Sequence, residues 1–275
     1  MKIRVILYCL LAGLAMTVAT LGTGHFAWWW LSGAVMAAAF VPVALFGPRS
    51  VLGQFGVIVP VMAIVTVFCT WSEGVMFIPQ ARARAVRDLI GALILYLIMA
   101  VVLAILAWAL RMPKSPASTP NSVDRRSLAG VFAMVLVCGV VYEIFYLVTG
   151  GITYQFFTKK YYPDAVQIAG SFGLWLWVIQ FGRGVLMTLA VIPAIYTLRM
   201  PRWQSATSIG ILIWVAGGLA LLLVPNPLMG PTQRLIHTVE ILTQNAPLGI
   251  IAVLLLRPRP TATPASVPKV AAARV

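Results

Sequence analysis

Apolar residues run along this chain in long stretches, and short segments between them hold most of the polar residues. A helix needs about 20 mainly apolar residues to cross the hydrocarbon core of a bilayer. Eight stretches approach or exceed this length, so we predict about eight transmembrane helices. The predicted spans are 5–22, 27–46, 52–71, 88–110, 128–149, 171–198, 207–224 and 234–256.

Composition supports lipid as the solvent for most of the chain. Of its 275 residues, 61% are hydrophobic and only 9% are charged, against about 25% charged in a soluble domain. So few charges cannot cover a water-soluble protein of this size. The first stretch is too long for a signal-peptide core of about 7 to 15 residues, and a second stretch follows at once, so we interpret it as a span. The predicted fold class is an all-α, polytopic transmembrane bundle.

The distribution of Lys and Arg predicts the orientation, because these residues accumulate in cytoplasmic connections. With both termini in the cytoplasm, the inner segments hold thirteen of them and the outer segments six, with Arg183 inside a span. This pattern is typical of a multi-pass protein of a bacterial inner membrane. Arg82, Arg84 and Arg87 are the exception, so residues 72–87 could form either an outer loop or a re-entrant element.

The spans fall into two sets of four. Residues 1–110 hold the first set, 111–127 form a Pro- and Ser-rich cytoplasmic linker, 128–256 hold the second set, and 257–275 form a basic tail that we expect to be disordered. Both sets have the same orientation, as in a parallel repeat. Their sequences show no convincing similarity, so duplication stays a hypothesis.

Polar residues in the last span lie on one face. Arg234, His237, Glu240 and Gln244 are spaced 3, 3 and 4 residues apart, which at about 100° per residue places them on a single stripe. Asn245 borders it. Pro231 suits the first turn of this helix, and Asn226 lies in the stiff Pro-Asn-Pro turn that precedes it.

Arg183 lies near the middle of the sixth span, where an unpaired charge is costly. We predict an ion pair with Glu143 or Glu240, which should lie at a similar depth. The expected hydrogen-bonding neighbours are Tyr142, Tyr146, Gln180 and His237. The candidate polar-pocket or substrate-binding residues, toward the outer leaflet, are Glu73, Tyr142, Glu143, Gln180, Arg183, Asn226, Arg234, His237, Glu240, Gln244 and Asn245.

Several functions remain open for such a cluster. It could only lock helices together. A His, carboxylates and an Arg at membrane depth are also the parts of a proton relay or anion site, which favours a small transporter or proton-coupled permease. A binding, sensing or assembly factor that engages a lipid or a partner helix is an alternative, and an intramembrane hydrolase in which Glu240 or Glu143 activates water is another.

The expected partners follow from the same residues. They are membrane lipid and an anionic substrate or a proton, and a homo-oligomer is left open. Despite a net charge of +14, no nucleic-acid-binding pattern is present. His237-x-x-Glu240 alone is a weak metal motif and the three cysteines match no metal or disulfide spacing, so we expect neither a metal nor another cofactor.

The segment from Pro225-Asn226-Pro227 through Arg234-x-x-His237-x-x-Glu240 to Asn245 resembles the closing region of an uncharacterised group of bacterial multi-pass inner-membrane proteins. The resemblance covers about the last 60 residues of the chain and implies no activity. It implies that Asn226, Arg234, His237, Glu240 and Asn245 matter as a unit.

Overall fold

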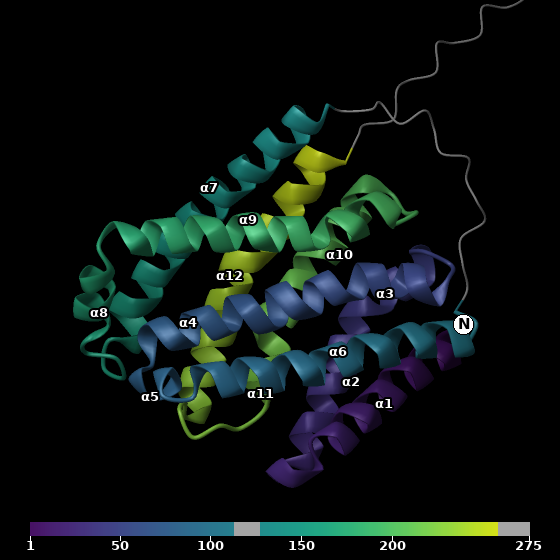
Figure 1. Cartoon of the computed structure of the whole chain (residues 1–275), viewed down its shortest axis with the longest axis horizontal. Coiled ribbons are helices and arrows are strands. Elements are labelled where there is room, and N and C mark those ends of the chain that lie inside the picture. The colour runs from purple at the N-terminus through teal and green to yellow at the C-terminus, as the bar shows by residue number, and fades with distance from the viewer. Residues whose placement is uncertain (113–126, 258–275) are drawn as a thin grey trace, which may run out of the picture.

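The computed structural model describes residues 1–112 and 127–257. In these two ranges every regular element is a helix, and they pack side by side into one bundle (Figure 1). Most of the predicted linker, residues 113–126, and most of the predicted basic tail, residues 258–275, lie outside the described residues.

Eight helical spans are long and apolar enough to cross a membrane, which confirms the predicted fold class. The chain is a multi-pass membrane protein. Four spans are single helices: α1 (Lys2–Ala19), α2 (Phe26–Phe46), α6 (Ala85–Ala109) and α9 (Leu174–Thr197). The last span is also one helix, α12 (Pro231–Leu256), and it begins at the predicted first-turn proline.

Three spans contain a segment of wider, π-helical turns. The third consists of α3 (Val51–Pro60), η2 (Val61–Cys69) and α4 (Thr70–Phe77). The seventh consists of α10 (Arg202–Trp214), η4 (Val215–Leu219) and α11 (Ala220–Leu223). In the fifth, η3 (Tyr154–Thr158) ends α7 (Leu128–Thr153).

The third span is longer than the sequence predicts, and this changes the interpretation of residues 72–87. Helix α4 continues to Phe77 and ends at Ile78, whose extended backbone is expected before a proline. A short helix α5 (Pro79–Arg82) follows, and Arg82 donates hydrogen bonds of 2.9 and 2.7 Å to the carbonyls of Val75 and Met76. Residues 72–77 therefore belong to the third span, and Arg82 caps the end of its helix.

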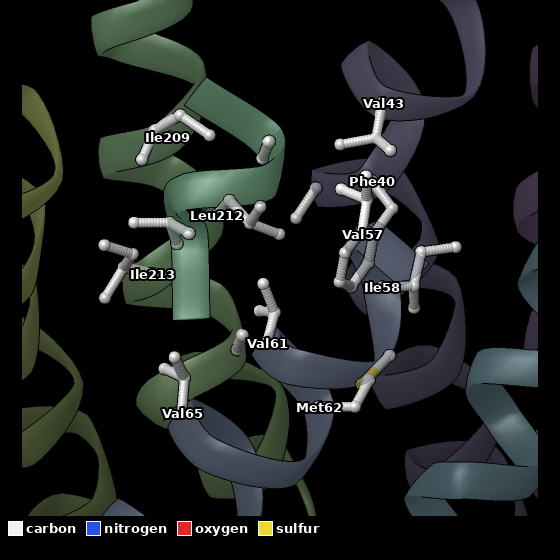
Figure 2. Packing of buried hydrophobic residues seen from close by; sticks show 14 of the residues in the cluster. Phe40, Val43, Val57, Ile58, Val61, Met62, Val65, Ile209, Leu212 and Ile213 are labelled. Carbon is white, nitrogen blue, oxygen red and sulfur yellow. The ribbon is translucent and has the colours of Figure 1, made fainter. Parts of the chain in front are cut away.

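Branched aliphatic side chains fill the centre of the bundle. Figure 2 shows α3 and η2 on one side and α10 on the other, with Val61 pointing into the space between them. Val61, Val65 and Ile213 are fully buried. Large apolar side chains such as Ile94 and Ile144 are instead more than half exposed on the outside of α6 and α7. Lipid is the solvent that makes such a surface stable.

Candidate functional site

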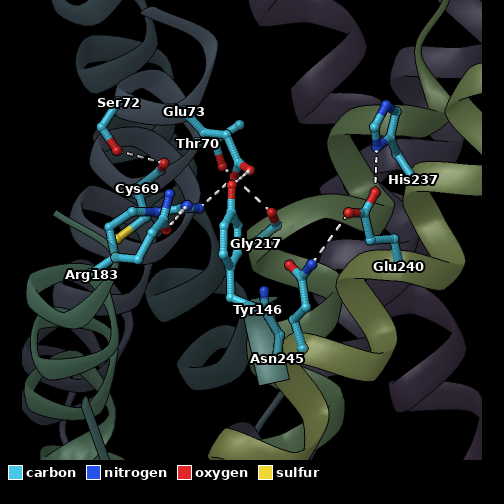
Figure 3. A network of polar contacts seen from close by, with 12 residues as sticks. Cys69, Thr70, Ser72, Glu73, Tyr146, Arg183, Gly217, His237, Glu240 and Asn245 are labelled. Atoms are coloured by element: carbon cyan, nitrogen blue, oxygen red, sulfur yellow. Dashed lines mark hydrogen bonds and ion pairs between the residues drawn. The ribbon is translucent and has the colours of Figure 1, made fainter. Parts of the chain in front are cut away.

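Arg183 is the centre of a buried polar group at membrane depth. It lies on α9 and is only 6% exposed. One guanidinium nitrogen, Nη2, lies 2.6 Å from Oε2 of Glu73 on α4, and Nη1 donates a hydrogen bond of 2.6 Å to Oε1 of Gln180 (Figure 3). The charge is therefore neutralised by one carboxylate from a different span.

Two tyrosines of α7 complete this group, which we call the arginine cluster. The guanidinium carbon lies 5.7 Å from the ring centre of Tyr142 and 5.8 Å from that of Tyr146, within the range of cation–π attraction. The hydroxyl of Tyr146 also donates a hydrogen bond of 3.2 Å to Oε1 of Glu73. The side chain of Cys69 lies beside the guanidinium (Figure 3). The cluster thus ties α4, α7 and α9 together.

The predicted ion pair of Arg183 with Glu143 or Glu240 is wrong, and Gln180 is confirmed as a hydrogen-bonding neighbour. Tyr146 hydrogen-bonds Glu73 instead of Arg183, and Tyr142 contacts the guanidinium through its ring alone. Glu73 takes the place of the expected partner because the third span continues through α4. Successive residues of a helix point about 100° apart, so the inward orientation of Tyr142 turns Glu143 aside. Within the described residues Glu143 has no hydrogen bond or ion pair, and it precedes the lipid-exposed Ile144.

His237 and Glu240 form a second polar group on α12, which we call the histidine cluster. Nδ1 of His237 lies 2.7 Å from Oε2 of Glu240, and its Nε2 lies 3.4 Å from the hydroxyl of Tyr162 in the outer connection. Gln244 donates a hydrogen bond of 3.4 Å to Oε1 of Glu240. His237 is therefore not the neighbour of Arg183 that the sequence predicts. Burial, together with the carboxylate of Glu240, raises the pKa of Tyr162.

The two clusters lie next to each other across α7. Gly150 follows Tyr146 by one helical turn, and a Cβ at Gly150 would lie 3.5 Å from Oε1 of Glu240. Figure 3 shows Tyr146 pointing to Glu73 on one side and the His237–Glu240 pair on the other.

The remaining candidates of the last span hold the backbone around these clusters. Arg234 donates hydrogen bonds of 3.1 Å to the last carbonyls of α11, those of Leu222 and Leu223, which lack helical partners. Asn245 is buried and donates to the carbonyl of Ile213 on α10 over 3.3 Å. The polar stripe therefore divides between the histidine cluster and helix packing.

Asn226 shapes the outer turn and contacts neither cluster. Its Oδ1 accepts hydrogen bonds of 3.0 Å from the backbone N–H groups of Leu228 and Met229. The five residues implied by the resemblance therefore act at separate places: Asn226 in the turn, Arg234 at α11, His237 and Glu240 in the histidine cluster, and Asn245 against α10.

Two residues that contact the clusters were not among the predicted site residues: Cys69 beside Arg183 and Tyr162 beside His237. Cys69 is embedded in an apolar run, and Tyr162 belongs to a connection whose fold-back onto α12 has no local pattern.

Shallow hollows on the surface of the described residues lie at the connections between spans and are not lined by Arg183, Glu73 or His237. One, of about 530 Å³, is lined by residues 82–87 and Ile90, and another, of about 480 Å³, by residues between Gln155 and Pro163. No three His, Cys, Asp or Glu side chains gather as a metal site in the part of the chain that the structure describes.

Comparison with known proteins found no relative of this chain. No protein-family model, no curated protein and no solved structure matches this chain. Any function must therefore be argued from the geometry of the two clusters.

Proposed function

We propose that the protein is a small proton-coupled permease of a bacterial inner membrane that carries an anionic solute. The observation that supports this most is the buried Arg183–Glu73 pair, which joins two spans in the middle of the bundle. A charged residue at this depth is costly and by default a candidate for function. A guanidinium offers a planar fork of donors that fits a carboxylate or phosphate.

The two partners differ in their exposure at the surface of the bundle, and this suggests how a proton would be used. The side chain of Arg183 is 7% exposed, whereas that of Glu73 is 35% exposed. A proton bound by Glu73 neutralises the carboxylate and leaves Nη2 of Arg183 available to an anion. Loss of the proton restores the pair and displaces the anion. One proton and one anionic solute would then cross together.

The histidine cluster would deliver protons to Glu73. Imidazole is the side-chain group whose unperturbed pKa, about 6.5, lies closest to physiological pH, so the ring of His237 is the natural candidate for a proton carrier in this cluster. It contacts Tyr162 of the outer connection on one side and Glu240 on the other. Tyr146 then bridges toward Glu73 through its hydroxyl. The proposed relay consists of Tyr162, His237 and Glu240 on one side of α7 and of Tyr146 and Glu73 on the other.

The test is solute-driven proton uptake by proteoliposomes that contain a pH-sensitive dye. Lactate, succinate and inorganic phosphate are added outside in turn, with membrane potential clamped by potassium and valinomycin. We expect at least one anion to acidify the lumen with the natural chain, and Glu73→Gln to abolish the response. The matched control is Glu143→Gln, which should retain it. Absence of acidification with all three anions would contradict the proposal.

One observation favours a second function, that of a binding or assembly factor. Glu143 lies near lipid-exposed apolar residues of α7 and has no partner within the described residues, so it could pair with a basic residue of another transmembrane helix. In that case Glu143→Gln, and not Glu73→Gln, would remove function. A hydrolase in which Glu240 activates water is less favoured because both carboxylate oxygens of Glu240 are already engaged, Oε2 by His237 and Oε1 by Gln244.

A further inference from the structure

The two sets of four spans pack in the same pattern. In the first set, α1 contacts α2, α2 contacts α3, α3 contacts α6, and α6 closes the ring against α1. In the second set, α7, α9, α10 and α12 form a ring in the same order. Between the rings, η2 and α3 contact α9, η4 and α10 contact α2, and η2 contacts η4. Exchange of the two sets reproduces these contacts.

Close contacts between glycines fix the register of the two rings. A Cβ at Gly33 of α2 would lie 2.6 Å from Cβ of Met16 on α1. A Cβ at Gly184 of α9 would lie 2.6 Å from Cβ of Tyr142 on α7. Gly33 also packs on Gly13, which lies three residues before Met16 in α1. In the same way Gly184 packs on Gly139, which lies three residues before Tyr142 in α7.

Aligned on these contacts, the two sets share a sequence pattern. Gly-x-x-Met-x-x-Ala-x-x-Pro occurs in α2 at Gly33, Met36, Ala39 and Pro42, and in α9 at Gly184, Met187, Ala190 and Pro193. The shift of 151 residues that aligns them also aligns the buried aliphatic residues that follow: Ile58, Val61, Met62 and Val65 with Ile209, Leu212, Ile213 and Ala216. It places η4 opposite the middle of η2. Contacts, sequence and helix type therefore agree.

We infer that the chain is a duplicated four-helix unit and that the solute path runs between the two halves, closed on the inner side by Val61, Val65, Leu212 and Ile213. This inference rests on the proposed permease function. The arginine cluster lies at the same boundary, because Arg183 belongs to the second half and Glu73 to the first. Parallel repeats in transporters place the substrate site at the repeat interface.

The two halves differ at the position of the charge. The shift that aligns them places Ser32 opposite Arg183 and Val224 opposite Glu73. Ser32 is fully buried, and its hydroxyl has no hydrogen-bond partner within the described residues. Only one of the two equivalent boundaries therefore carries an ion pair, so the duplicated scaffold holds a single site.

The π-helical segments are the elements that permit the gate to move. Their wide turns have a hydrogen-bond pattern that differs from that of the flanking helices, and such turns are frequent at functional sites. The segments touch, because a Cβ at Gly217 of η4 would lie 3.3 Å from Cγ1 of Val65 in η2. Directly after η2, the hydroxyl of Thr70 in α4 donates to the Gly217 carbonyl over 3.5 Å. A change in one segment therefore reaches the other directly.

The experiment measures access to the gate from the inner side during turnover. Val61→Cys and Leu212→Cys are made in a background without the natural cysteines, after its anion-driven proton uptake has been measured. The thiols are exposed to a membrane-impermeant methanethiosulfonate ammonium reagent on the inner face. We expect both, as equivalent positions, to react at least tenfold faster when anion and pH gradient are present. Ile211→Cys, next to the gate but 44% exposed on the surface, is the matched control and should not change.

Each outcome decides between the inference and the function on which it rests. Anion-driven proton uptake without faster labelling of either cysteine would overturn the inference and leave the permease in place. Labelling of only one of the two would overturn the equivalence of the halves. Absence of both uptake and labelling would overturn both proposals. Faster labelling at low pH without net uptake would support the path and overturn proton–anion coupling.

Discussion

Removal of the charges of Arg183 and Glu73, singly and together, tests the arginine cluster. Arg183→Met leaves the Glu73 carboxylate without its cation, and Glu73→Gln leaves the guanidinium with neutral partners. The double variant removes both charges and should recover part of the lost stability. Removing one member of a buried ion pair typically costs about 3 to 5 kcal/mol, more than the intact pair contributes.

The structure sets the expected magnitude. With Nη2 and Oε2 2.6 Å apart, two unit charges with centres about 4 Å apart attract by about 4 kcal/mol at an effective dielectric constant of about 20. The Glu73 side chain is 35% exposed, and water weakens the pair from that side. We therefore expect each single substitution to lower the free energy of unfolding by about 2 to 4 kcal/mol, with a coupling energy of about 1 to 3 kcal/mol.

The assay is unfolding by sodium dodecyl sulfate in mixed micelles, followed by helical circular dichroism. The matched control is Glu143→Gln, which removes a carboxylate that has no partner within the described residues and should change stability by less than about 0.5 kcal/mol. A cycle of Arg183→Met with Glu240→Gln should be nearly additive. Strong coupling in that cycle, or a larger loss for Glu143→Gln than for Glu73→Gln, would refute the geometry of the cluster.

Three further results are expected. Gly33→Leu and Gly184→Leu should each lower the free energy of unfolding by about 1 to 3 kcal/mol through overpacking. Gly182→Leu is the control, because nothing lies within 4 Å of its Cβ position. Equal stability of all three variants in the same unfolding assay would contradict the helix contacts. Asn245→Leu strips the buried carbonyl on α10 of its donor and should cost about 1 to 3 kcal/mol, measurable as a lower melting temperature. Glu240→Gln removes a negative charge that raises the pKa of Tyr162, so the Tyr162 phenolate should form at lower pH. Ultraviolet difference titration measures this, with Tyr162→Phe as the blank. An unchanged midpoint would show that Glu240 does not act on Tyr162.

The number and approximate position of the spans could be predicted from the sequence, because hydrophobic length is a local property. The unbroken apolar runs and the sparse charges sufficed for eight helices. The position of Tyr146, Gln180 and Arg183 at membrane depth could also be predicted, because each stands out against apolar neighbours. The sequence also marks Glu73 as a candidate, but just past the end of its predicted span. The partners could not be predicted, since pairing depends on how the helices turn toward one another.

Two features were decided by tertiary structure alone. Arg183 pairs with Glu73, and not with Glu143 or Glu240, because helix α4 continues beyond the expected end of its span and the packing of Tyr142 turns Glu143 away from the interior. The likeness of the two halves rests on a few small or common residues in α2 and α9 that are unremarkable among so many apolar ones. Glycine contacts such as that of Gly33 with α1 and that of Gly184 with α7 provide the register, and such contacts exist only once the helices are packed.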